Sequence, residues 1–114
     1  MRTVLIVDDE FASRDCLRQL LEQDGRAVIT AADGHQALAL LRTIPLPRLI
    51  VLDLAMPRMN GWEFLTNKNE DPVIAGIPTI VLSGTLTELP AGAMDHLTKP
   101  VDLGRLRALV DQYC

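Results

Sequence analysis

Five polar side chains stand where apolar runs of the sequence end, and their types suit phosphoryl chemistry: Asp8, Asp9, Asp53, Ser83 and Lys99. Three carboxylates brought close together repel one another at neutral pH, so they favour the binding of a cation. Oxygen ligands without a nearby His or Cys favour a hard ion, and an incomplete protein shell suits Mg²⁺, which shares phosphate oxygens. A carboxylate nucleophile beside an ammonium group and a hydroxyl group then suits phosphoryl transfer to Asp53 itself.

These side chains lie far apart in the sequence, and the expected secondary structure brings them together. Strands are expected at Thr3 to Val7, at Ala27 to Ala31, in the run that ends at Asp53, at Thr79 to Leu82 and at Asp95 to Thr98. Helical segments between the strands indicate parallel strands joined by right-handed crossovers, which is an α/β, doubly wound sheet. The carboxyl ends of all strands then open on one edge, where such folds bind ligands.

Apolar spacing predicts the helices between these strands. The first has Cys16, Leu17, Leu20 and Leu21 on one side, with Cys16 expected to pack as a small apolar residue. The others are a helix capped by Asp33 with Ala37, Leu40, Leu41 and Ile44; a helix from about Gly61 with Trp62, Phe64 and Leu65, expected to dissolve in the polar run from Asn67 to Pro72; and a last helix with Leu103, Leu106, Val110 and Tyr113.

Length and composition limit the classes of protein that remain. The 114 residues suit one domain, and the longest apolar runs have the length of strands, so no membrane span is expected. No signal peptide precedes the first strand, which favours the cytoplasm and two reduced thiols, Cys16 and Cys114. The net charge of −4 and the scattered basic residues disfavour nucleic acid as a partner.

Each polar residue also has a simpler interpretation when taken alone. Asp8 and Asp9 suit the cap of the following helix, where negative charge is favourable. Ser83 suits a turn, and Lys99 suits a solvated position before Pro100. Coincidence at four strand ends is much less probable than any one of these, so the shared site is the better hypothesis.

Four motifs in this order resemble the receiver domain of two-component response regulators: Val7-Asp8-Asp9-Glu10; Val51-Leu52-Asp53-Leu54-Ala55-Met56-Pro57 with Asn60-Gly61; Val81-Leu82-Ser83-Gly84; and Ala91-Gly92-Ala93 through Leu97-Thr98-Lys99-Pro100. The resemblance covers nearly the whole chain. It implies a CheY-like fold, with a five-stranded parallel sheet of order 2-1-3-4-5 flanked by five helices.

The resemblance also implies the role of each site residue. Asp53 resembles the aspartate that accepts a phosphoryl group from a histidine kinase or histidine phosphotransfer protein. Asp9 resembles the direct Mg²⁺ ligand, Asp8 its water-mediated partner, and the backbone carbonyl of Ala55 a further ligand, with Asp53 completing the set.

The resemblance further implies a switch. Ser83 stands where the family has a hydroxyl that turns toward the phosphoryl group, and Lys99 resembles the phosphate-contacting lysine, with a cis bond to Pro100. His96 replaces the usual aromatic switch residue. It is either a retuned, pH-sensitive switch or a residue that no longer switches.

The connection from Ser83 to Lys99 is short for a receiver, at 16 positions. The segment Thr85 to Gly92 contains a Pro and ends in Gly, so a loop or at most one helical turn is predicted in place of the family's fourth helix. Leu86, Leu89 and Met94 are then needed to cover the sheet. Because the family reports phosphorylation through this surface, either a partner recognises an altered face, or the exposed apolar surface mediates self-association as a homodimer, or another face signals.

Two classes of function stay open, with a third of lower weight. The first is a stand-alone phosphoacceptor receiver over residues 1–114, not an enzyme with free substrate, although a fragment of a longer regulator would read the same. The second is a phosphate-independent interaction module that kept the fold. The third, a Mg²⁺-dependent phosphatase, lacks an evident general acid or substrate-binding insertion.

Overall fold

The computed structural model describes residues 3–43, 45–56, 58–84 and 89–114. Its five strands form one parallel sheet in the order β2-β1-β3-β4-β5, as predicted. The strands are β1 (Thr3–Val7), β2 (Ala27–Ala31), β3 (Leu49–Asp53), β4 (Thr79–Ser83) and β5 (Asp95–Thr98).

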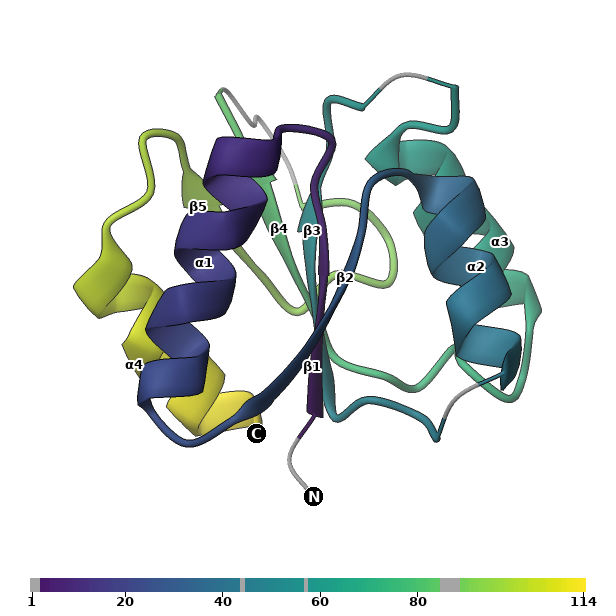
Figure 1. The fold of residues 1–114 in the computed structure, drawn as a ribbon. Coiled ribbons are helices and arrows are strands. Elements are labelled where there is room, and N and C mark those ends of the chain that lie inside the picture. Colours follow the sequence, from purple (N-terminus) through teal and green to yellow (C-terminus); the bar gives the residue numbers. More distant parts are fainter. Residues whose placement is uncertain (1–2, 44, 57, 85–88) are drawn as a thin grey trace.

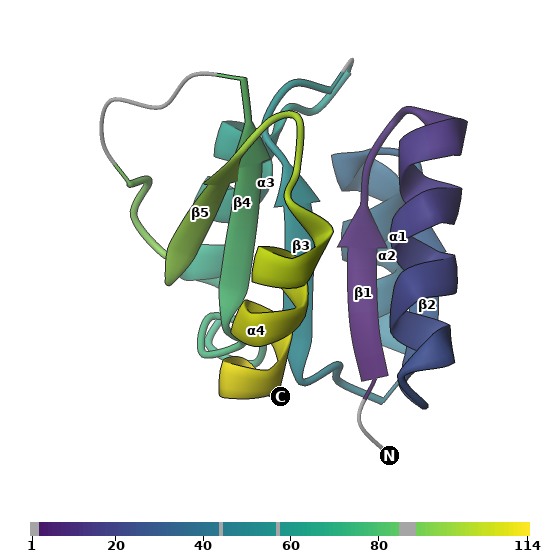
Figure 2. The same ribbon diagram turned by 90° about the vertical axis from the view of Figure 1, so that its left-hand side faces the viewer.

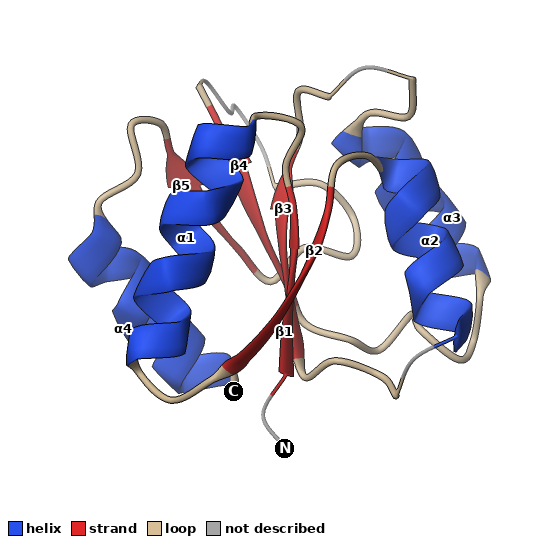
Figure 3. Ribbon diagram, viewed as in Figure 1, coloured by secondary structure: helices blue, strands red, loops and turns tan. Residues whose placement is uncertain are grey.

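Four helices in the described ranges cover the two faces of this sheet: α1 (Phe11–Gln23), α2 (Gly34–Thr43), α3 (Gly61–Glu70) and α4 (Leu103–Tyr113). Helices α1 and α4 lie on one face, and α2 and α3 lie on the other (Figures 1 and 3). Within the described parts of the chain, no helix is long and apolar enough to cross a membrane.

The three central strands β1, β3 and β4 are buried on both sides, which explains their nearly continuous apolar runs. Along β1, Val4 and Ile6 join the core under α1 and α4, whereas Leu5 and Val7 join the core under α2 and α3. Since side chains alternate across a strand, one short segment supplies both cores.

Helix α3 is longer than the sequence indicated. A capping box fixes its start: the Asn60 side chain accepts from the Glu63 N–H at 2.9 Å, and the Glu63 carboxylate accepts from the Asn60 N–H at 3.2 Å. The predicted end near Asn67 is wrong, because Lys68 is fully buried and continues the apolar face of Phe64. The aliphatic stem of a lysine can fill a position that its charge seems to exclude.

The connection from β4 to β5 contains no helix in its described residues, 89–94, which agrees with the predicted loop; residues 85–88 lie outside the described ranges (Figure 2). Of the residues considered as a cover for the sheet, Leu89 and Met94 are exposed, at 44% and 53%, and Leu86 is among the residues not described. Ala93 packs against the core instead. The Asn69 side chain donates to the Ala91 carbonyl at 2.9 Å, which ties this loop to α3.

Two further expectations about side chains are wrong. Cys16 is exposed rather than packed in the core, because Leu17 and Leu21 alone make the buried stripe of α1. Leu103 is 38% exposed at the start of α4, where it precedes the buried face that begins at Leu106. Ile44 lies outside the described residues.

Candidate functional site

Three acidic side chains gather at the carboxyl edge of the sheet. Carboxylate oxygens of Asp8, Asp9 and Asp53 all lie within 4.8 Å of one another. Asp8 is fully buried and Asp53 is 2% exposed, whereas Asp9 is open to solvent. The neighbouring strands β1 and β3 end side by side, which joins residues 45 positions apart in the sequence.

Asp8 is held by the turn that leads into α1. Its carboxylate accepts from the Glu10 N–H at 2.9 Å and from the Ser13 hydroxyl at 2.8 Å, and the Arg14 guanidinium donates to its carbonyl at 2.7 Å. The N-cap of α1 is Glu10, which makes no side-chain capping bond, so the simple capping interpretation of Asp8 and Asp9 is wrong.

Ser13 and Arg14 were missed by the sequence reasoning as residues that support the site. The available signal was their place in the first turn of the helix that directly follows two aspartates. Hydrogen bonds from neighbouring residues, such as these to Asp8, commonly orient the carboxylates that hold a cation.

Lys99 reaches the acidic cluster from the end of β5. Its ammonium lies 3.1 Å from Asp53 Oδ2, and its backbone N–H donates to the Ser83 carbonyl at 2.8 Å. The Lys99-Pro100 bond is cis, as expected. The other Asp53 oxygen, Oδ1, accepts from the Ala55 N–H at 3.1 Å.

The environment of Asp53 raises the pKa of its carboxyl above the ordinary value. Burial is the largest cause, and the negative charge of Asp8 adds to it. The Ala55 N–H and the Lys99 ammonium oppose this shift because both favour the carboxylate. A cation beside this cluster would therefore relieve an unfavourable concentration of negative charge.

The loop after Asp53 is fixed at both ends. Gly61 donates its N–H to the Leu54 carbonyl at 2.9 Å. Within the loop, the Arg58 guanidinium forms an ion pair with the Asp33 carboxylate at 3.0 Å. The Asp33 carboxylate also accepts from the Gln36 N–H at 2.8 Å, as expected for the N-cap of α2.

We expect Gly61→Ala to destabilise the protein by about 1–3 kcal/mol. A Cβ at this position would lie 2.6 Å from Leu54 Cα and 2.9 Å from the Asp53 carbonyl oxygen, and backbone atoms cannot rotate away. Gly76→Ala is the matched control, since nothing lies within 4 Å of its Cβ, and its change should stay within about 0.5 kcal/mol. Urea unfolding measures both. A stability of Gly61→Ala equal to that of the wild type would contradict the expected clash.

A cleft of about 590 Å³ opens beside the acidic cluster. Its described lining residues are Asp9, Leu54, Ala55, Met56, Asn60, Trp62 and Ser83. Ser83 is half-buried at the end of β4 and shares this cleft with Asp9. The structure thus brings the five polar residues predicted for the site, together with Ala55, to one edge of the sheet: Asp8, Asp9, Asp53, Ser83 and Lys99.

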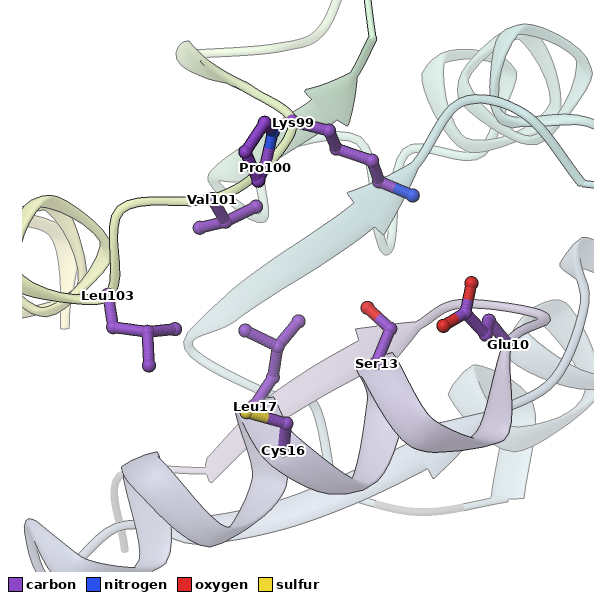
Figure 4. A pocket seen from close by; sticks show the side chains of 8 residues that line it. All are labelled: Glu10, Ser13, Cys16, Leu17, Lys99, Pro100, Val101 and Leu103. Atoms are coloured by element: carbon purple, nitrogen blue, oxygen red, sulfur yellow. The ribbon is translucent and has the colours of Figure 1, made fainter.

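A second cleft, of about 440 Å³, lies between α1 and the segment that joins β5 to α4. Figure 4 shows Glu10 at the N-cap of α1 and Ser13 on its first turn, both below the Lys99 side chain, with Leu17 facing Val101 and Leu103 across the gap. The exposed Cys16 lies on the same wall. This cleft is mainly apolar and adjoins the acidic site through Lys99.

His96 lies apart from the acidic cluster. It pairs in register with Val81 in the middle of β4, and its backbone N–H donates to Asp95 Oδ1 at 2.8 Å. The side chain is half-buried. Its role as a switch stays a prediction.

The acidic cluster fits a hard divalent ion. Its donors are carboxylate oxygens alone, from Asp8, Asp9 and Asp53, and the exposed Asp9 leaves one side open to water. Mg²⁺ prefers such an incomplete oxygen shell, which leaves positions for waters and phosphate oxygens.

A doubly wound parallel sheet with polar and charged residues gathered at its carboxyl edge defines the class of α/β proteins that bind ligands at the ends of their strands. The chain belongs to the response regulator receiver domain family, which it matches over residues 4–111. Receiver domains are signalling modules of two-component systems; they bind Mg²⁺ at an acidic pocket and interact with histidine kinases or phosphotransfer proteins.

Curated relatives differ in how much of their length the chain spans. It is 42% identical over 117 residues to an "Uncharacterized 14.6 kDa protein in sodA1 3'region" of Leptolyngbya boryana, covering 97% of the chain and 88% of that protein. It is 40% identical to the KDP operon transcriptional regulatory protein KdpE of Escherichia coli, covering 95% of the chain but only 49% of KdpE. The chain thus spans about half of the longer regulators it matches.

Solved structures show the same fold. The receiver domain of the Francisella response regulator 1452 has a TM-score of 0.90 at 29% identity, covering 99% of this chain and 96% of that one. The Vibrio cholerae chemotaxis protein CheY4 has a TM-score of 0.86 at 29% identity, covering 100% and 99%. Both likenesses extend over nearly the entire chain.

Proposed function

We propose that Asp53 of this receiver accepts a phosphoryl group from a histidine kinase or histidine phosphotransfer protein. One observation carries the proposal: a buried carboxylate shares its space with Asp8 and Asp9 and has one oxygen 3.1 Å from the Lys99 ammonium. A structural ion pair needs only one cation and one carboxylate. Three carboxylates around one lysine leave negative charge that a divalent ion and a phosphoryl group together would balance.

The residues have separate roles in this transfer. An Asp53 oxygen attacks the phosphorus, the bond from phosphorus to the donor nitrogen breaks, and its electron pair stays on that nitrogen. Lys99 and Ser83 contact the phosphoryl oxygens, and the fixed Lys99 charge stabilises the transition state. Asp9, Asp53 and the Ala55 carbonyl would hold Mg²⁺, with Asp8 through a water; the bound ion supplies further positive charge to the phosphoryl oxygens.

Intact-mass measurement tests this function. The chain is incubated with Mg²⁺ and phosphoramidate, and we expect the mass of one phosphoryl group on the wild type and on Asp111→Asn, a remote and exposed control. No addition is expected on Asp53→Asn or after chelation of Mg²⁺. If the wild type binds Mg²⁺ but gains no mass, the phosphate-independent interaction module is the better function. Continued release of phosphate without an adduct would instead indicate a phosphatase.

We propose that a downstream partner of this receiver binds the surface beside β5. Leu89 and Met94 are exposed there, and the described residues 89–94 form no helix over them. A downstream protein partner that recognises this face would contact residues 89–94 in a non-helical conformation.

A further inference from the structure

Trp62 is a large aromatic residue placed at the edge of the acidic cleft without being buried there. Its side chain is 46% exposed, and it lines the same cleft as Asp9 and Ser83. Trp62 is the only tryptophan of the chain. An exposed tryptophan contributes little to folding compared with a buried one, but it is well suited to bind a flat ligand.

The backbone around Trp62 is held firmly. Gly61 before it lies against Leu54 and Asp53, with no space for even a Cβ. The Asn60–Glu63 capping box encloses the same turn. The indole is therefore carried by a rigid helix start, so little conformational entropy is lost when a ligand packs against it.

The direction of phosphoryl transfer defines what would meet this indole. The attacking oxygen and the leaving atom lie roughly in line through the phosphorus. Because Asp53 is at the buried end of the site, the leaving group of its donor must lie toward the open side. Among the described residues that line the cleft, Met56 is buried and Trp62 is exposed, so the indole is the large apolar side chain available to a group on the solvent side.

We propose that Trp62 determines specificity for the leaving group, by packing against the flat ring of a phosphorylated imidazole. This inference rests on the proposed phosphoacceptor function. In the step concerned, Asp53 forms a bond to phosphorus while the bond from phosphorus to the ring nitrogen breaks, and neutral imidazole leaves with that electron pair. The protonated ring of the donor carries positive charge, which favours contact with an indole face. Ammonia, the leaving group of phosphoramidate after proton uptake, is too small to gain from this contact.

Donor preference tests the inference. Phosphorylation rates are measured with N-phosphoimidazole and with phosphoramidate, at the same Mg²⁺ concentration, for wild type, Trp62→Leu and Trp62→Phe. We expect Trp62→Leu to lose about three- to tenfold in rate with phosphoimidazole, as for one aromatic contact, and less than about twofold with phosphoramidate. Trp62→Phe should retain most of the rate. Val73→Ala, at an exposed apolar residue outside both clefts, should change neither.

The possible results distinguish a failure of the role of Trp62 from a failure of the proposed phosphoacceptor function of Asp53. An equal loss with both donors, or no loss with either, overturns the role of Trp62 while leaving Asp53 as the acceptor. If neither donor phosphorylates the wild type, the proposed function fails and the inference falls with it. Thermal unfolding of each variant shows whether the fold is retained, and a loss confined to phosphoimidazole cannot arise from unfolding.

Discussion

Lys99→Met is expected to slow phosphorylation of Asp53 by about 100- to 1000-fold, in the range found for removal of one group that stabilises a transition state. The Lys99 ammonium lies 3.1 Å from Asp53 Oδ2, so it is positioned to contact a phosphoryl group on that carboxylate. Methionine keeps the apolar stem and removes the charge. The rate is measured by intact mass at fixed phosphoramidate and Mg²⁺.

The same substitution should strengthen Mg²⁺ binding, about three- to tenfold, because it removes a positive charge from an acidic cluster. Titration of Mg²⁺ against the unphosphorylated chain measures this. Loss of transfer together with a gain in metal affinity cannot come from unfolding, which would weaken both. Arg42→Met, at an exposed position on α2, should leave both quantities near the wild-type values. Weaker Mg²⁺ binding by Lys99→Met would contradict the assigned electrostatics.

Lys68→Met is expected to stabilise the fold at pH 7, by about 1–4 kcal/mol, as replacement of buried charge by apolar groups often does. Lys68 is fully buried on α3, and its ammonium donates to the Ala75 carbonyl at 2.9 Å. No carboxylate pairs with it among the described residues. Methionine has a similar length and suits the face that holds Phe64 and Leu65.

This stabilisation should shrink as pH rises. Burial lowers the pKa of Lys68 below the ordinary lysine value, so between these two pKa values the unfolded chain binds more protons than the folded one. The free energy of unfolding of the wild type therefore rises with pH through this window. This gain in the free energy of unfolding of the wild type is complete above the ordinary lysine pKa. It is lost as pH falls through the lowered pKa of Lys68.

Urea unfolding of the wild type and Lys68→Met from pH 7 to pH 10 measures both effects. Other titrating groups are common to the two proteins, so they cancel in the difference. Arg42→Met serves as the control and should show a change within about 0.5 kcal/mol at every pH. A difference for Lys68→Met that stays constant over this range would contradict a lowered Lys68 pKa.

The predicted sheet and its functional edge follow from local patterns. The runs that end at Val7, Asp53 and Ser83 are apolar at nearly every position, which is typical of strands buried on both faces. Parallel strands with right-handed crossovers leave little freedom in where their ends lie. The meeting of Asp8, Asp9, Asp53 and Lys99 could therefore be predicted before any contact was known.

The errors arose where residue type and burial disagree. Lys68 was read as part of a polar turn, although it is buried and extends α3. Cys16 was expected to be covered, although it is exposed. Whether a side chain is covered depends on segments distant in sequence, such as the loop that reaches α3 through Asn69.

The sequence by itself determined the fold and which residues meet at the acidic edge, because short-range periodicity and a fixed crossover hand decide them. The family followed from a different signal, the resemblance of its four motifs to those of receiver domains. Only the tertiary structure decided how those residues are held, with Asp8 bound by Ser13 and Asp53 by Ala55 and Lys99. It also decided that Trp62 lines the same cleft as Asp9 and Ser83. These contacts depend on distances of a few ångströms between separate elements, and no local pattern in the chain encodes such distances.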